Sequence, residues 1–355
     1  KDLFLFFLFF ELALIPAFFL IGIWGYRDRE KAANQFLIYN GVGSAIMLLA
    51  FLILINTAGF SVTPLADNRA IMTYSGDIET IAANLKDSES YANMKPENVG
   101  VNLPFYTSPA LLWTTFIMLI VAFGIKLPIF PFHTWMLRVH TEAPTGMVMI
   151  HSGILLKMGA YGMIRFGVQL FPDHVRDAAV ALAVLGVVNI LYGAVLAFRQ
   201  KEFKLILAYS SVSHMGIILL GIASLNEIGI QGAVFQMVSH GLIAALMFLI
   251  IGSLYERTGT SRIDELGGLA KAAPFMCGML LAAGFASLGL PGLSGFIAEY
   301  MSFLGLFESM PVLTIIAALS VVLTAAYVLR GVMGMTFGPF RESMGDIREA
   351  RLVEA

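Results

Sequence analysis

The sequence predicts an all-α polytopic membrane protein with about nine transmembrane helices, two of them broken, arranged as inverted repeats. Hydrophobic residues make up 58% of the 355 positions and charged residues only 13%, which is more apolar surface than a soluble core of this size could bury. The apolar residues form runs of roughly 20, the length that crosses a bilayer as a helix. Two runs are overlong and interrupted by proline and glycine. We therefore expect a single membrane bundle over residues 1–355.

The spans follow one another in chain order. They cover residues 3–25, 34–56, 109–140, 147–171, 177–198, 204–224, 229–255, 272–307 and 310–337, with ends that are approximate. The first follows Lys1-Asp2 directly, without the basic region or cleavage site of a signal peptide, so we interpret it as a retained span. Residues 57–108 are hydrophilic and mostly acidic, and we expect a solvated external loop there, with partner binding as the alternative.

The third and eighth spans carry helix-breaking residues. Pro128 and Pro131 interrupt the third span just after Lys126, and the segment Leu290-Pro291-Gly292-Leu293-Ser294-Gly295 interrupts the eighth. Proline removes a backbone donor and clashes with the preceding turn, so each span should divide into two half-helices. Unwound backbone at this depth is tolerated only where protein or a wet cavity covers it, which favours a transport function.

The two broken spans lie five spans apart, so they run through the membrane in opposite directions. Transporters built from inverted repeats have this arrangement, with their sites near the midplane. We place an incomplete first half-repeat at about 1–171 and a second half-repeat at about 177–337.

The basic residues predict the orientation, because Lys and Arg gather in cytoplasmic connections. One side carries Arg27, Arg29, Lys31, Arg138, Arg199, Lys201, Lys204, Arg257, Arg262, Lys271, Arg330, Arg341, Arg348 and Arg351. The other side carries Lys1, Arg69, Lys86, Lys95, Arg165 and Arg176. The first set is the larger, so we assign it to the cytoplasm and place residue 1 outside.

Two lysines lie near the middle of apolar spans, where an ionisable residue costs about 2.5–3.5 kcal/mol and usually marks an ion pathway. Lys157 is roughly 15 Å from either end of its span, too far for its ammonium group to reach the lipid headgroups easily. Lys126 ends a half-helix, where the dipole stabilises a cation, and Glu299 is expected in about the first turn of another, where it stabilises an anion. This matching of charge to dipole favours a function for both.

Other titratable residues fall at similar depth. Glu11, His214 and His240 occupy the first, sixth and seventh spans, and together with the lysines and Glu299 we predict that they form a proton relay. A lone histidine is more often a hydrogen-bonded core residue, and the simpler alternative is that these groups only hold helices together. His151 is a weaker relay candidate that stays open. We expect four further residues to be interfacial and structural: His133, Arg138, His140 and His174.

Several classes of function are disfavoured. The net charge of −2 argues against a nucleic-acid partner. The single cysteine, Cys277, cannot form an intrachain disulfide or supply the thiolates of an iron–sulfur or zinc site, and we interpret it as an apolar filler. The sequence contains no GxGxxG, phosphate-loop, CxxC or HExxH motif. No cofactor or metal is expected in this chain, so any redox chemistry must reside in partner subunits.

Five long motifs carry a resemblance to a known family. They are KLPIFPFHTW, HTEAPTGMVMIHSGILLKMGAYGMIRF, LILAYSSVSHMG, QMVSHGLIAALMFLIIGSLYERTGT and FASLGLPGLSGFIAEY. They resemble the antiporter-like membrane subunits of bacterial respiratory complex I, the proton-translocating NADH:quinone oxidoreductase, and most closely the M type. The resemblance covers nearly all of residues 3–337. Family members carry roughly four more spans before Glu11 and one more after residue 337, which implies a truncated chain.

The resemblance implies roles for individual residues. Glu11 is expected to pair with Lys126, Lys157 to be the central relay lysine, and His214 and His240 to continue a polar axis toward Glu299. Related subunits usually carry lysine at the position of Glu299, so glutamate there favours the M type. The family commonly has Leu-Pro-Asp-Ala-His after the tryptophan, whereas this chain has Met136-Leu137-Arg138-Val139-His140, without the acid.

The resemblance also implies partners and a location. The chain is expected in the inner membrane of the cell beside other membrane subunits, including neighbouring antiporter-like ones. NADH, FMN, iron–sulfur clusters and quinone are expected in partner subunits, so this chain is a non-redox, proton-pumping subunit of a translocase.

The mechanism that follows is a hypothesis. Burial disfavours a charged lysine and a nearby carboxylate favours it, so separating Glu11 from Lys126 should drive a proton toward Lys157, onward through the histidines, and out past Glu299. Two alternatives remain: the large subunit of a multisubunit Na⁺/H⁺ antiporter, and an electron-transfer protein with haem held by His214 and His240.

Overall fold

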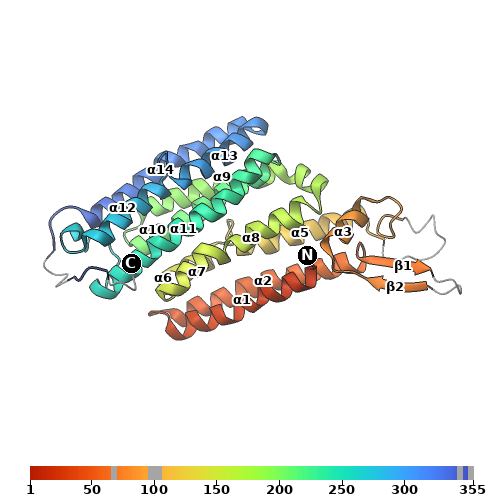
Figure 1. Ribbon diagram of the computed structural model, residues 1–355, viewed down its shortest axis with the longest axis horizontal. Helices are drawn as coiled ribbons and strands as arrows, with labels where there is room; N and C mark the ends of the chain where they lie inside the picture. Colours follow the sequence, from red (N-terminus) through yellow and green to blue (C-terminus); the bar gives the residue numbers. More distant parts are fainter. Residues whose placement is uncertain (65–69, 95–105, 342–346, 351–355) are drawn as a thin grey trace.

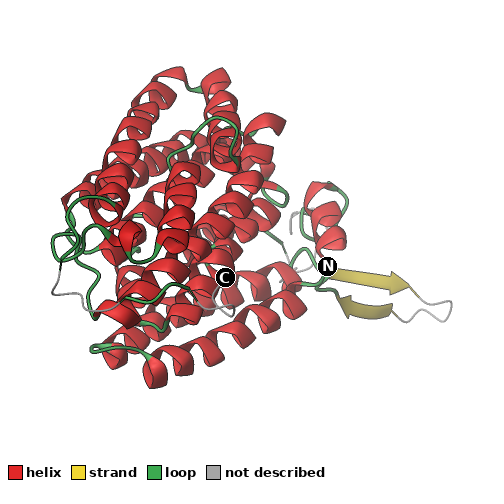
Figure 2. Cartoon of the chain, turned by 60° about the vertical axis from the view of Figure 1, so that its left-hand side comes forward, coloured by secondary structure: helices red, strands yellow, loops and turns green. Residues whose placement is uncertain are grey.

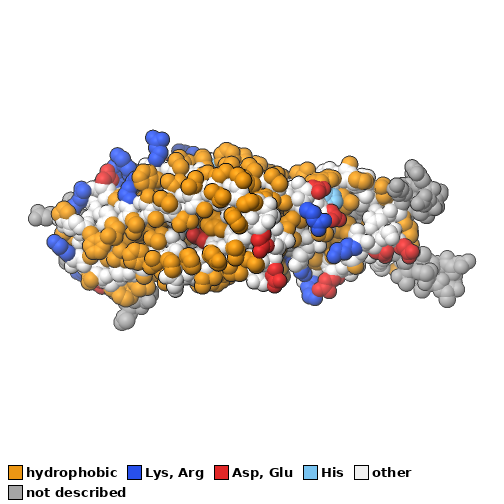
Figure 3. Space-filling model, turned by 90° about the horizontal axis from the view of Figure 1, so that it is seen from above, with side chains coloured by type: hydrophobic (Ala, Val, Ile, Leu, Met, Phe, Trp, Pro, Cys, Tyr) orange, Lys and Arg blue, Asp and Glu red, His pale blue; other side chains and the backbone are white. Residues whose placement is uncertain are grey.

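The predicted helical bundle is confirmed in a computed structural model of the chain, which describes residues 1–64, 70–94, 106–341 and 347–350. The long helices run side by side along the longest axis of the molecule, and a β-hairpin extends from one end (Figure 1). Within the described residues, eight helices are long and apolar enough to cross a membrane. Side chains over the middle of the molecule are mostly hydrophobic, and charged side chains gather toward its two ends (Figure 3).

The first half of the chain forms two long helices, a small external subdomain and a broken helix. Its elements are α1 (Leu3–Trp24), α2 (Arg29–Asn56), β1 (Phe60–Pro64), β2 (Ala70–Tyr74), α3 (Ile78–Lys86), α5 (Pro109–Lys126), α6 (Thr134–Glu142), α7 (Thr145–Ile150), a π-helical turn His151–Leu155, α8 (Lys157–Gly162) and a second π-helical turn Met163–Val168. The four elements after α6, from Thr145 to Val168, make one continuous span.

The second half is a more tightly packed set of helices. Its elements are α9 (Pro172–Arg199), α10 (Phe203–Ala223), α11 (Glu227–Thr258), a 3₁₀ turn Leu269–Lys271, α12 (Pro274–Ser287), α13 (Ser294–Ser309) and α14 (Pro311–Thr336). Helix α10 is the most enclosed span: 89% of its most apolar window is buried, against 22% for α1. The polar residues that α10 carries are therefore enclosed by protein rather than lipid.

The external segment has more structure than the sequence predicted. Residues 57–108 were expected to form a solvated loop, but β1 and β2 pair as an antiparallel hairpin with Phe60 opposite Tyr74 (Figure 2). Asp77 then caps α3 by accepting hydrogen bonds from the backbone N–H and hydroxyl of Thr80, which lowers the pKa of its carboxyl group. The stretches 65–69 and 95–105 of the predicted loop lie outside the described residues, and so do Arg69, Lys95 and Arg351.

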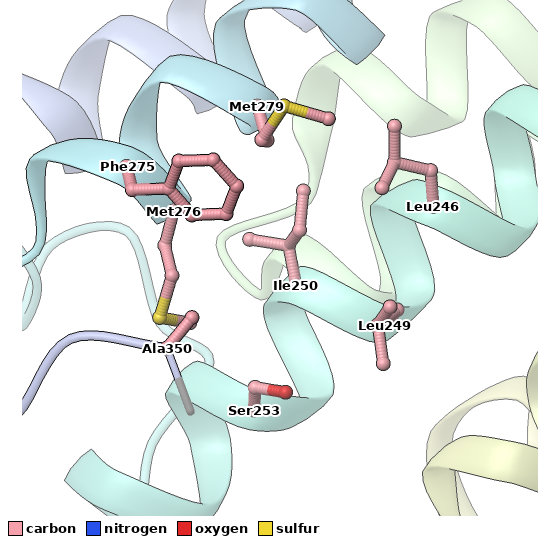
Figure 4. A pocket seen from close by; sticks show the side chains of 8 residues that line it. All are labelled: Leu246, Leu249, Ile250, Ser253, Phe275, Met276, Met279 and Ala350. Carbon is pink, nitrogen blue, oxygen red and sulfur yellow. The ribbon is translucent and has the colours of Figure 1, made fainter. Parts of the chain in front are cut away.

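The last described residues return to the bundle. The Glu349 carboxylate accepts hydrogen bonds from the backbone N–H groups of Phe275 (2.8 Å) and Met276 (3.2 Å), so it caps the start of α12. A mostly apolar pocket lies beside this cap, between α11 and α12, with Ala350 at its edge (Figure 4). This pocket carries no titratable side chain and is not a candidate site.

Candidate functional site

Both predicted helix breaks are present. Helix α5 ends at Lys126, and the chain turns through Pro128 and Pro131 before α6 begins. Buried polar side chains hold this turn: the Asn189 amide oxygen accepts a 2.7 Å hydrogen bond from the Phe130 N–H, and the Trp135 indole donates to the Ile125 carbonyl at 3.1 Å. Backbone groups that the break releases are thus paired inside the protein, as the membrane requires.

Lys126 is buried in an aromatic surrounding. Its ammonium nitrogen lies 4.9 Å from the centroid of the Phe10 ring and 5.7 Å from that of Phe36. Glu11 is within electrostatic reach of this ammonium group, but its carboxylate accepts a hydrogen bond from the Ser44 hydroxyl instead. No direct ion pair between Glu11 and Lys126 is present among the described side chains.

A histidine pair lies between the two lysines. His140 on α6 and His151 on the π-helical turn are both fully buried, and His140 Nε2 is 3.0 Å from His151 Nδ1. His151 lies within electrostatic reach of both Lys126 and Lys157. The remaining ring nitrogens, His140 Nδ1 and His151 Nε2, are buried and have no hydrogen-bond partner among the described residues. The expectation that His140 is interfacial is therefore wrong.

The signal that could have placed His140 inside is its helical register. Residues Trp135, Met136, Val139 and His140 are the buried positions of α6, and they share one face of the helix. His133, which directly precedes α6, lies next to Tyr192 on α9, with 3.2 Å between its Nε2 atom and the phenol oxygen. His133 is therefore also buried rather than at a surface. The ring of His174 meets that of Trp113 edge to face, with ring centroids 4.7 Å apart, near the start of α9.

Lys157 lies between two π-helical turns. In the first, the Leu156 N–H bonds to the His151 carbonyl, five residues back, and the Ser152 carbonyl accepts from the Lys157 ammonium group. The same ammonium nitrogen is 2.8 Å from His240 Nδ1 on α11. Single π-helical turns inside α-helices are frequent at functional sites, and this one frees a carbonyl to hold the lysine.

The polar contacts continue from α11 to the second break. The rings of His240 and His214 lie with centroids 5.0 Å apart, and His214 Nδ1 is 3.5 Å from Glu299 Oε1. Gln236 also approaches His214 Nδ1, at 3.1 Å. These residues line one small cavity with Ser239, Ser287 and Gly295.

The second break runs between α12 and α13. Gly292 has a φ of +96°, which favours glycine, and Pro291 precedes it. At Gly295 a Cβ atom would lie 2.1 Å from the Ala286 carbonyl oxygen, so only glycine fits. Helix α13 begins at Ser294, which puts Glu299 in its second turn rather than its first. Because the dipole effect falls off within one turn, His214 is the main partner of this carboxylate.

The buried groups thus form a file that starts at one break and ends at the other. In spatial order they are Lys126, the His140–His151 pair, Lys157, His240, His214 and Glu299. Each lies on a different helix or turn, and each is at most 8% exposed. Direct contact between His214 and His240 leaves no room for a porphyrin between them, which disfavours the haem alternative.

A model of one protein family matches residues 1–324, and its description is "NADH:quinone oxidoreductase/Mrp antiporter, TM". The chain belongs to this family. Its membership confirms the resemblance to antiporter-like subunits of complex I, and curated relatives agree with the M type. NADH-quinone oxidoreductase subunit M of Rickettsia prowazekii is 39% identical and matches 93% of this chain and 60% of its own length. NAD(P)H-quinone oxidoreductase chain 4 2 of Thermosynechococcus vestitus is 40% identical over all of this chain and 61% of its own length.

Solved structures share the fold. A chain of respiratory complex I from Thermus thermophilus with bound NADH superposes with a TM-score of 0.84 at 32% identity, over 100% of this chain and 68% of that one. A chain of the Mrp complex from Dietzia sp. has a TM-score of 0.79 at 24% identity, over 96% of this chain and 58% of that one, and supports the fold alone. This chain spans about three-fifths of the length of these curated relatives.

Proposed function

We propose that this chain is part of a proton-translocating membrane subunit of NADH:quinone oxidoreductase, and that protons move through it from Lys126 to Glu299. The observation that carries the proposal is the buried file of titratable side chains joining the two helix breaks. Ionisable residues at membrane depth are expensive and are retained mainly where they serve ion or proton movement.

The path has two kinds of step. Lys157 and His240 share a 2.8 Å hydrogen bond along which a proton can pass, and His214 Nδ1 lies 3.5 Å from Glu299 Oε1, close enough for transfer after a small movement. Between Lys126 and His151 the link is electrostatic, and the unpaired ring nitrogens of the histidine pair offer positions for bridging waters. Movement of Glu11 toward or away from Lys126 controls whether the lysine holds its proton. Glu299 then releases protons on the outer side.

The chemistry along the file favours protons over sodium. Sodium, like other hard cations, is bound by oxygen ligands, whereas the middle of the path offers an ammonium group and four imidazoles. In the part of the chain that the structure describes, the carboxylates near the path are Glu11 and Glu299, at its two ends. The alternative function, a subunit of a multisubunit Na⁺/H⁺ antiporter, therefore fits the central residues less well.

Energy must come from partner subunits in the inner membrane. Moving one proton against 100 mV costs about 2.3 kcal/mol. The names of the relatives place NADH and quinone chemistry in their complexes, and we infer that redox steps there, with FMN and iron–sulfur clusters, drive this chain through membrane contacts with its neighbours.

Lys157→Met tests the proposal in the assembled complex. The variant should lower the number of protons moved per NADH oxidised in proteoliposomes while NADH:quinone activity with an uncoupler persists. Exposed Lys201→Met is the control and should pump normally. Unchanged pumping in a correctly assembled Lys157→Met complex would mean that the buried charges only hold helices together. Pumping that requires sodium would favour the antiporter alternative.

A further inference from the structure

A third buried lysine lies outside the relay, at the cytoplasmic end of the bundle. Lys204 is the second residue of α10 and only 6% exposed. The dipole at a helix N-terminus disfavours a cation, so neither burial nor the helix explains a lysine there. No carboxylate forms a direct ion pair with its ammonium group in the described part of the chain.

Two tyrosine rings hold the ammonium group instead. Its nitrogen lies 4.1 Å from the ring centroid of Tyr26 and 3.8 Å from that of Tyr255, and the two rings meet edge to face at 5.0 Å. Cation–π contacts of this kind are strongest where the cation is desolvated. Three carboxylates surround the group at longer range: Glu142 at the end of α6, Glu202 before α10 and Glu256 on α11.

The rings come from segments that are far apart in the sequence. Tyr26 lies in the turn between α1 and α2, and Tyr255 lies near the end of α11. Lys204 therefore joins three elements, from both halves of the chain, at one point.

The turn between α1 and α2, which carries Tyr26, also forms hydrogen bonds to the connection between α6 and α7. The Tyr26 N–H donates to the Glu142 carbonyl at 2.7 Å, and the Asp28 N–H donates to the Glu142 carboxylate at 2.9 Å. On the other side, Thr145 packs against Gly252 of α11 so closely that a Cβ on the glycine would lie 2.3 Å from the threonine methyl group. The α6–α7 connection is thus fixed from two directions.

This connection carries the histidine pair. His140 lies two residues before Glu142, and His151 lies six residues after Thr145, so the turn sets the distance between the two rings. We propose that Lys204 is a positioning residue: its ammonium group, held between Tyr26 and Tyr255, fixes the α6–α7 turn so that His140 and His151 stay in contact between the relay lysines. The part concerning proton movement rests on the function proposed above.

Four variants test this in the assembled complex. Lys204→Met removes the charge and Tyr255→Leu removes a ring, whereas Lys204→Arg and Tyr255→Phe keep the cation and the ring. The first pair should speed hydrogen exchange at the Tyr26 and Asp28 amides by about tenfold, and the second pair should not. Lys201→Met, exposed at the same end, is the control. If the Lys204→Met complex fails to assemble, the comparison of Tyr255→Leu with Tyr255→Phe provides the test.

Pumping supplies the second readout. In Lys204→Met and Tyr255→Leu, the number of protons moved per NADH should fall while uncoupled NADH oxidation is preserved. Lys204→Arg and Tyr255→Phe should pump like the parent. Unchanged exchange in both Lys204→Met and Tyr255→Leu would overturn the positioning role. Faster exchange with normal pumping would overturn the link to the histidine pair. Because exchange is measured without pumping, this result is separate from failure of the proposed function, which Lys157→Met reports.

Discussion

The two helix breaks differ in how their charged residues are partnered. At the first break, Lys126 faces the rings of Phe10 and Phe36, and the nearest carboxylate, Glu11, is occupied by Ser44. At the second, Glu299 is already 3.5 Å from His214, which faces His240 and so Lys157. At the second break, Glu299 is already in contact with the next residue of the file. At the first break, Glu11 has to move before it can pair with Lys126. We infer that control of the path lies at Lys126.

Lys126→Met should have the largest effect. An apolar side chain of similar length fits the aromatic surrounding but cannot carry a proton, so this chain's whole contribution to pumping should disappear. The measurement is protons moved per NADH in proteoliposomes, with uncoupled NADH oxidation as the control for assembly. Pumping at the parent level would remove Lys126 from the path.

Glu299→Gln should have a smaller effect, because glutamine keeps the size of the side chain and one acceptor oxygen while it removes the charge. Losing one proton acceptor at a connected end should slow transfer about tenfold, the effect of roughly 1.4 kcal/mol on a barrier. Glu308→Gln, on an exposed part of α13, is the matched control. A loss as large as that of Lys126→Met would show that the two ends are equally limiting.

Ser44→Ala tests why the first end is unpaired. Without the hydroxyl, Glu11 is free to bind Lys126 directly, which stabilises the charged lysine and should slow proton release. A hydrogen bond to a charged group is worth about 1.5–3 kcal/mol, so a slowing of about tenfold is the lower end of the expected range. Faster pumping would mean that Ser44 restrains Lys126 in some other way.

Asn189→Leu tests the clamp on the first break. It leaves the buried Phe130 N–H without an acceptor, which should cost about 1–3 kcal/mol of stability. Asn189→Asp keeps the oxygen and serves as the comparison. Thermal unfolding of the purified complex measures both, and equal stability of the leucine variant would show that water or another group satisfies the N–H.

Substitutions at the N-terminal caps of α5 and α12, the first half-helix of each broken span, should give the smallest effects. Helix α5 is capped locally by the Ser108 hydroxyl, which accepts from the Leu111 N–H, whereas α12 is capped by the distant Glu349. Replacing either cap with alanine should cost about 1 kcal/mol of stability. Thermal unfolding that responds to Ser108→Ala but not to Glu349→Ala would show that the second cap is weaker.

The sequence predicted the spans, the breaks and the burial of Lys126 and Lys157, because apolar run length and proline position directly determine them. It missed what depends on three-dimensional packing. The π-helical turns around Lys157 leave no mark on apolar periodicity, so neither the Ser152 carbonyl contact nor the partnering of His151 with His140 was foreseen. Lys204 was counted with the surface cations because its position near a span end resembles theirs.

Other differences come from local hydrogen bonding. Helix α13 begins one residue before Gly295, at Ser294, which moves Glu299 out of the first turn. In the external segment the polar composition hid the alternation that pairs β1 with β2. Both depend on which backbone groups find partners, and a single sequence without coordinates does not specify that choice.

One continuous path from Lys126 to Glu299 is the central claim, and the double variant Lys126→Met/Glu299→Gln tests it most directly. Steps in series share one limit, so the double variant should move as many protons per NADH as Lys126→Met alone. Independent contributions would add, so pumping that survives in Lys126→Met and falls further in the double variant would contradict the account.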